Sequence, residues 1–98
     1  MLRLSPEATD DLRRLYLDGL DRFGRGQADA YLSDIYDVLD LLGRYPQMGV
    51  ERVGIDPPVR THPHGHHVFV YRLLDDGTAE CLRVRHERED WVGDLSDP

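Results

Sequence analysis

The chain has 98 residues and a formal net charge of −7, so it is long enough to bury one modest hydrophobic core and too short for two. The acidic balance argues against direct DNA binding and against avid binding to any nucleic acid, which depends on neutralising many phosphates. All 12 basic residues are arginine, which excludes a mechanism that needs a lysine.

Cysteine content and hydropathy indicate where the protein works. The single cysteine, Cys81, cannot form an internal disulfide. No apolar run approaches the roughly 20 residues that are needed to cross a bilayer, and no charged-then-apolar leader opens the sequence. We therefore expect a cytoplasmic protein with no membrane contact, in which residues 1–98 form a single domain. We expect Cys81 to be a small buried hydrophobic residue.

The first half of the chain predicts an edge strand and two helices. Met1 to Leu4 alternates like a short strand. Ser5-Pro6-Glu7 is typical of a helix start, and the early acids favour the positive end of the helix dipole. The first helix should run to about Phe23, before a break at Gly24-Arg25-Gly26. Its apolar side comprises Ala8, Leu12, Leu15, Tyr16, Leu20 and Phe23.

The second helix shows a cleaner apolar stripe. Its apolar residues step by three or four positions and are Ala28, Tyr31, Leu32, Ile35, Val38, Leu39 and Leu42. Four aspartates lie away from this stripe, and Gly43 and Pro46 end the pattern. The short break between the two stripes predicts an antiparallel helical hairpin.

The second half of the chain predicts strands. Residues 46–58 contain three prolines and two glycines and are typical of a connecting loop. Residues 59–64 can form a strand that turns into an apolar, β-branched strand over 67–74. Asp75-Asp76-Gly77 then supplies a hairpin turn before a last strand over 81–86.

The predicted order is therefore β-α-α-β-β-β, with strands that follow the helices rather than alternate with them. This order favours an α+β fold, in which an N-terminal helical hairpin packs on one face of a small, mainly antiparallel sheet. A short C-terminal helical turn is predicted from Trp91, Val92 and Leu95.

The face of the sheet away from the helices should be polar if water covers it, but it is mixed. Phe69, Tyr71 and Leu73 form one apolar side, and Leu82 and Val84 point away from two arginines. The other side carries a strip of valines and arginines that suits an amphipathic acidic segment of a partner. This predicted strip comprises Arg60, Val68, Val70, Arg72, Arg83 and Arg85. Alternatively, its arginines pair with the chain's own 19 acids.

Four histidines lie within six residues: His62, His64, His66 and His67. Alternate residues of a strand share a face, so His62 and His64 could present two imidazoles to zinc. Pro63 and Gly65 make the segment turn-like, and no cysteine or carboxylate completes a familiar ligand spacing. We therefore expect no metal and no other cofactor, and interpret the segment as a polar hairpin whose charge changes at about pH 6.5.

An ordered set of motifs along almost the whole chain resembles the ParE branch of the RelE/ParE toxins of bacterial type II toxin–antitoxin systems. The N-terminal motifs are Leu4-Ser5-Pro6-Glu7-Ala8, Asp11-Leu12, Phe23-Gly24, Gln27-Ala28 and Tyr31. Those that follow are Tyr45-Pro46-Gln47-Met48-Gly49, Gly65-His66-His67-Val68-Phe69-Val70-Tyr71-Arg72, Leu82-Arg83-Val84-Arg85-His86, Arg88 and Asp90-Trp91.

The resemblance implies the same α+β fold and a ParD-like antitoxin, a dimer in a hetero-oligomeric complex, whose flexible acidic tail would cover the predicted strip. It also implies inhibition of DNA gyrase by a toxin with no catalytic residues, with Arg88 and Trp91 as candidate target-binding residues. The related RelE branch instead cleaves messenger RNA on the ribosome with lysines, arginines and a terminal Tyr or His. A third alternative is a family member that has lost its toxicity.

The sequence favours the gyrase branch. Metal-independent cleavage of RNA needs a base, an acid and cationic groups around the phosphate. Arg60, Arg72, Arg83, Arg85 and His86 could supply part of this set. The lysines are absent, however, and the net charge is wrong for docking on ribosomal RNA.

Overall fold

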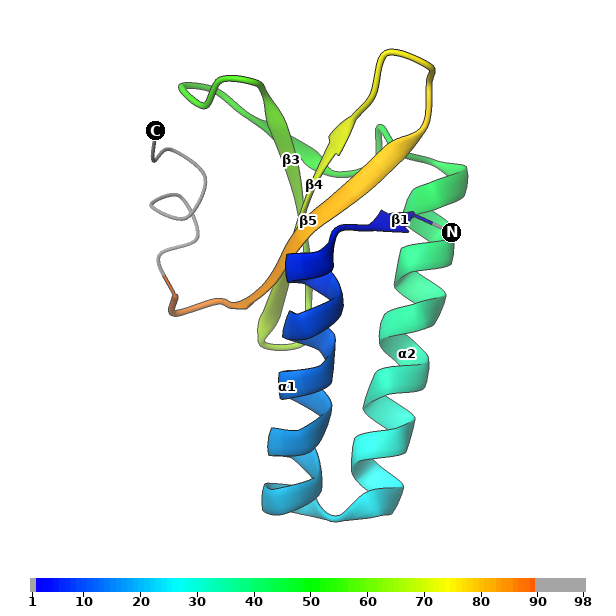
Figure 1. Ribbon diagram of the computed structural model, residues 1–98, viewed down its shortest axis with the longest axis vertical. Coiled ribbons are helices and arrows are strands. Elements are labelled where there is room, and N and C mark those ends of the chain that lie inside the picture. Colours follow the sequence, from blue (N-terminus) through cyan, green and yellow to red (C-terminus); the bar gives the residue numbers. More distant parts are fainter. Residues whose placement is uncertain (1, 90–98) are drawn as a thin grey trace.

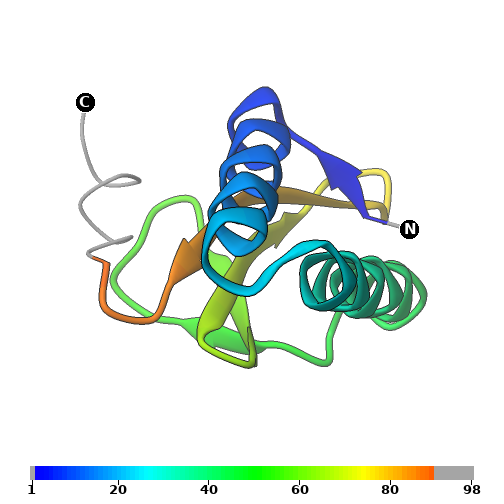
Figure 2. The ribbon, with the colours of Figure 1, turned by 90° about the horizontal axis from the view of Figure 1, so that it is seen from below.

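Two antiparallel helices lie side by side and cover one face of a twisted sheet (Figure 1, Figure 2). The computed structural model describes residues 2–89. The elements in chain order are β1 (Arg3–Leu4), α1 (Pro6–Phe23), α2 (Arg25–Arg44), β2 (Val50–Arg52), β3 (Val59–His64), β4 (His67–Leu73) and β5 (Ala79–His86).

The helical hairpin follows from local chemistry at its ends. The Oγ atom of Ser5 accepts a hydrogen bond of 3.0 Å from the Ala8 N–H, and Pro6 occupies the first turn, as the sequence predicts. The predicted three-residue break is a single residue, Gly24. Its φ of 85° lies in the left-handed region that favours glycine, so α2 begins at the next residue.

The sheet has the order β1-β5-β4-β3-β2, with β1 parallel to β5 and the other pairs antiparallel. The predicted α+β fold is therefore confirmed, including the edge strand at the N-terminus. The prediction of a loop over residues 46–58 is wrong at β2, which pairs with β3. All three β2 residues are exposed, so this strand has none of the alternation by which a strand is detected in a sequence.

The core lies between the helices and the sheet. Its buried residues are Leu2, Ala8, Leu12, Ile35, Leu39, Leu42, Phe69, Tyr71, Ala79, Cys81 and Val84. Phe23, predicted on the buried side of the first helix, is instead 60% exposed. The ends of both helices near their connection extend beyond the sheet (Figure 1), so Phe23 has no strand to pack against. Leu73, predicted to share the buried side of its strand, is also exposed.

A β-bulge changes which residues of β5 face the core. Val70 lies opposite Arg83 and Tyr71 lies opposite Cys81, which leaves Leu82 as an extra residue. An extra residue shifts the alternation of the strand, so Cys81 and Val84 both join the core. The expectation that Leu82 and Val84 share a face is wrong for this reason.

The buried carboxylate of Asp11 joins α1 to β5. Asp11 Oδ2 accepts hydrogen bonds from Arg83 Nε at 2.8 Å and from the Val84 backbone N–H at 3.0 Å. Asp11 Oδ1 accepts a third hydrogen bond from Arg83 Nη2 at 3.0 Å. The strand β1 pairs only with Glu80 and Cys81, so Asp11 takes the place of a strand partner where β1 has ended.

The substitution Asp11→Asn is expected to lower the free energy of unfolding by about 3 kcal/mol, because it removes one member of a buried ion pair. Chemical denaturation measures this loss. The matched control is Asp10→Asn, whose exposed carboxylate pairs with Arg14 and should contribute less than about 1 kcal/mol. Equal losses for the two variants would contradict the role given to Asp11.

Gly49 lies directly against Tyr71 at the start of β2. The Gly49 N–H donates to Tyr71 Oη at 2.9 Å, and the Tyr71 hydroxyl donates to the Pro46 carbonyl oxygen at 2.7 Å. A Cβ atom at position 49 would lie 2.5 Å from Tyr71 Oη and 2.9 Å from the Thr61 carbonyl oxygen. The glycine is therefore required by a close approach.

The substitution Gly49→Ala should destabilise the fold by about 1–3 kcal/mol, the usual cost of overpacking a buried contact. Gly26→Ala is the control, because nothing lies within 4 Å of an added Cβ there and alanine favours helices by about 1 kcal/mol over glycine. Thermal or urea unfolding should show a loss for the first variant and none for the second. A stable Gly49→Ala protein would disprove the close approach.

Candidate partner-binding surface

Five of the six residues in the predicted strip lie on the sheet face opposite the helices. Phe69 and Tyr71 are in the core, so the alternate residues of β4, Val68, Val70 and Arg72, point the other way. Their partners across the ladder, which share their face, include the two remaining arginines of the strip, since Val70 pairs with Arg83 and Val68 pairs with Arg85.

Arg60 does not join the strip on that face. It pairs with Tyr71 and therefore extends from the helix side of the sheet. Its Nη1 atom donates to the carbonyl oxygens of Gly49 at 2.8 Å and Gln47 at 3.2 Å. Arg60 thus supports the segment that leads into β2, and the expectation that it lies beside the valines is wrong.

The centre of the strip is closed by the chain's own side chains. Val70 is fully buried, and its ladder partner Thr61 is buried as well. The Arg52 Nε atom donates to Thr61 Oγ1 at 2.9 Å, which places the Arg52 side chain at the same part of this face. Val68 is only partly buried and is the more accessible valine.

The arginines of β5 are occupied within the molecule. The Arg83 side chain is 19% exposed and binds Asp11 through two nitrogen atoms. The Arg85 side chain is 18% exposed and forms an ion pair with Glu89. For these two arginines, the alternative interpretation, in which they pair with the chain's own acids, describes the structure.

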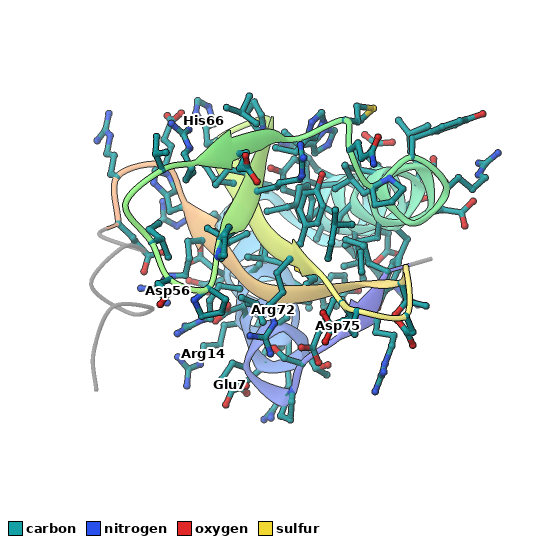
Figure 3. The ribbon with its side chains drawn as sticks, turned by 90° about the horizontal axis from the view of Figure 1, so that it is seen from above. Glu7, Arg14, Asp56, His66, Arg72 and Asp75 are labelled. Atoms are coloured by element: carbon teal, nitrogen blue, oxygen red, sulfur yellow. The ribbon has the colours of Figure 1, made fainter. Side chains whose placement is uncertain are left out.

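Arg72 is the most accessible cation of the strip. Its side chain is 37% exposed, and its Nη2 atom lies 3.7 Å from Glu80 Oε1, too far for a hydrogen bond. Its Nε atom is itself buried and, within residues 2–89, has no hydrogen-bond partner. Figure 3 shows Arg72 well separated from His66.

The structure brings Arg72 and Arg60 to one hollow of about 300 Å³ at the start of β3. The other residues that line it are Glu51, Pro57, Pro58, Val59, Leu73 and Asp75. Exposed apolar side chains occur along the neighbouring segment that leads into β2, including Tyr45, Met48 and Val50. Sequence reasoning missed this grouping, because it treated residues 46–58 as a connection.

The strand β2 is the last in the sheet order. Within residues 2–89, its outer edge therefore has no strand partner. An exposed edge offers backbone donors and acceptors to an added strand, while arginines and apolar side chains nearby supply selectivity. The arrangement at this end of the sheet is suited to binding a peptide segment.

The cationic groups do not gather into a site for phosphate chemistry. Arg85 and His86 line a second hollow, but the carboxylates of Asp11, Asp18 and Glu89 line it too and would repel a phosphate.

Cys81 is buried as predicted. Its burial, assisted by the negative charge of Asp11, raises the pKa of the thiol to about 12. The Cys81 thiol is therefore protonated at neutral pH and does not act as a nucleophile.

Of the two predicted target-binding residues, Arg88 alone lies within the described residues, near their C-terminal end. Arg88 is exposed, and its backbone N–H donates to His86 Nδ1 at 3.2 Å. Trp91, and the helical turn predicted from it with Val92 and Leu95, lie outside the described residues. Between residues 2 and 89, no three His, Cys, Asp or Glu side chains come together in a way that could hold a metal ion. Neither helix in that range has the length and hydropathy required to span a bilayer.

Comparisons with known proteins identify the family of the chain. The profile of the family described as "ParE toxin of type II toxin-antitoxin system, parDE" matches residues 2–91. Toxin ParE1 of Mycobacterium tuberculosis, from strains H37Rv and CDC 1551, is 33% identical over 87 residues, which are 89% of each protein.

A solved structure shows the same fold. A chain of the chromosomal ParDE toxin–antitoxin system from P. aeruginosa superposes with a TM-score of 0.73 at 22% sequence identity. The alignment covers 87% of the present chain and 92% of that one. The family profile spans both helices and every strand of the sheet. The chain belongs to the ParE toxin family of type II toxin–antitoxin systems.

Proposed function

We propose that this ParE family member arrests bacterial growth by binding DNA gyrase in the cytoplasm, and that a ParD-like antitoxin neutralises it. The toxin acts in this proposal as a binding protein, with no bond made or broken by its own residues. The observation that carries the proposal is the occupation of Arg83 and Arg85 by carboxylates of the same chain.

That occupation weighs against the alternative, a RelE-type messenger RNA nuclease. Such an enzyme must stabilise the charge that develops on a phosphate with cations that are free to approach it. In this chain Arg60 binds backbone carbonyl oxygens on the helix side of the sheet. Arg83 and Arg85 on β5 bind the carboxylates of Asp11 and Glu89. The sequence supplies no lysine as a replacement.

The antitoxin segment is proposed to bind the end of the sheet formed by β2, β3 and the Arg72 side chain. The predicted strip supplies the accessible Arg72 and the partly exposed Val68, beside the hollow that Arg72 and Arg60 line. An acidic, amphipathic segment would complement these groups, placing a carboxylate at the exposed part of the Arg72 guanidinium and apolar side chains near Met48 and Val50.

Supercoiling of relaxed plasmid by purified gyrase should be inhibited by the purified chain and restored by prior addition of the antitoxin encoded beside it. The same preparation should leave messenger RNA intact in a translating extract. Intact supercoiling together with cleaved messenger RNA would establish the RelE-type alternative. Intact supercoiling with intact messenger RNA would instead indicate a family member that has lost its toxicity.

Arg72→Ala should raise the dissociation constant for the antitoxin about tenfold, because a charge-assisted hydrogen bond contributes about 1.5 kcal/mol. Its effect on stability should be small, since the Arg72–Glu80 pair is long and partly exposed. Isothermal titration calorimetry measures the affinity. The control is Arg22→Ala on α1, an exposed arginine that pairs with Asp18, and it should leave affinity unchanged. Equal affinities for both variants would rule out this position for the antitoxin.

A further inference from the structure

Glu80 on β5 is the acid that faces Arg72 across the sheet. The hairpin between β4 and β5 fixes this pairing, because the register places Arg72 opposite Glu80 close to the turn. The turn is held by hydrogen bonds of its own. The Leu74 N–H donates to the Thr78 carbonyl oxygen at 2.7 Å, and the Thr78 N–H donates to Asp76 Oδ1 at 3.0 Å. Glu80 is therefore in place opposite Arg72 before any partner arrives.

A second arginine flanks Glu80. On its other side, Glu80 is the ladder partner of Arg3 on β1, so Arg3, Glu80 and Arg72 form a row across one face of the sheet. The Glu80 side chain is 22% exposed, and its Oε1 atom lies 3.7 Å from Arg72 Nη2, beyond the length of a hydrogen bond. Glu80 thus offsets part of the charge on Arg72 through a long ion pair.

Arg83, on the same face, is held in a different way. It donates two hydrogen bonds, of 2.8 and 3.0 Å, to the buried carboxylate of Asp11. A partner's acid cannot take Arg83 without leaving that buried charge unpaired. The pair of Arg72 and Glu80 is longer and reaches the surface, so it is weak. A charge-assisted hydrogen bond from Arg72 to a partner's carboxylate would be the stronger contact.

We propose that Glu80 is an internal competitor for the partner's carboxylate at Arg72. In the free chain, Glu80 lowers the attraction of this guanidinium for other anions. In the complex, an acid of the antitoxin segment takes its place at Arg72, and Glu80 keeps Arg3 as a neighbouring cation. This inference rests on the antitoxin site proposed above. It makes the affinity of that site depend on a residue that does not have to contact the antitoxin.

The variant Glu80→Gln tests the competition, because glutamine keeps the length of the side chain and removes its charge. It should lower the dissociation constant for the antitoxin encoded beside the chain by up to about fivefold, the effect expected of a partly exposed ion pair. Isothermal titration calorimetry measures this gain. The gain should shrink as the ionic strength rises, since salt screens exposed charges. An unchanged or weaker affinity would overturn the proposal.

A second background separates competition at Arg72 from general repulsion between acids. If Glu80 acts through Arg72, the substitution Glu80→Gln should no longer change the affinity in an Arg72→Ala chain. A gain that persists there would reveal repulsion at a distance and refute the competition. The matched control is Asp18→Asn, which removes one charge from an exposed ion pair on α1 and should leave the affinity unchanged. An equal gain in this control would point to net charge alone.

Failure of the competition can be told from failure of the proposed site. If Arg72→Ala weakens antitoxin binding and Glu80→Gln does not strengthen it, the site stands and the competition is rejected. If Arg72→Ala leaves the affinity unchanged, both are rejected. Arg3→Gln decides the matter should Glu80→Gln not fold. Without its second cation, Glu80 should pair more strongly with Arg72 and weaken antitoxin binding, and an unchanged affinity would contradict the proposal.

Discussion

The carboxylate of Asp11 is the contact on which the arrangement of this molecule depends. It satisfies a backbone N–H on β5, holds the guanidinium of Arg83 with two hydrogen bonds, and ties α1 to the sheet at the place where β1 has ended. Its side chain is only 5% exposed. A carboxylate in such a position is stable only while its partners remain, so helix, strand and arginine are fixed together.

This constraint determines which arginines remain for other molecules. An arginine that neutralises a buried carboxylate cannot also neutralise a phosphate or a partner's acid without leaving the first charge unpaired. Arg83 is therefore part of the fold. Arg72, whose guanidinium is more exposed and lies 3.7 Å from Glu80, is placed to meet a partner. The difference is set by depth and neighbours, since both residues lie on the same face of the sheet.

Much of the fold could be predicted from the sequence, because its signals are local. The Ser5 cap, the apolar stripe of the second helix and the alternation around Phe69 each act within a few residues. The strand β2 could not be predicted, since it is short and exposed and exists only through its pairing with β3. The bulge at Leu82 depends equally on a partner strand.

The candidate surface was less predictable than the fold. Arg60 was expected beside the valines, but its face is set by its register against Tyr71, and register is a property of two strands. In the sequence, Asp11 is explained by the helix dipole, which favours an acid in the first turns of a helix. Nothing in the sequence indicates that its carboxylate meets an arginine 72 positions away. The side chains that sequence reasoning missed are therefore those whose partners lie far away along the chain.

The pairing of Asp11 with Arg83 is tested most directly by a double-mutant cycle. The free energies of unfolding of the wild-type chain, Asp11→Asn, Arg83→Gln and the double variant provide the coupling energy between the two side chains. A structural pair predicts that the double variant loses less stability than the two single variants combined, with a coupling of about 1.5–3 kcal/mol. Additive losses would show that Arg83 does not depend on Asp11, and would return this arginine to the groups available for a partner or for a phosphate.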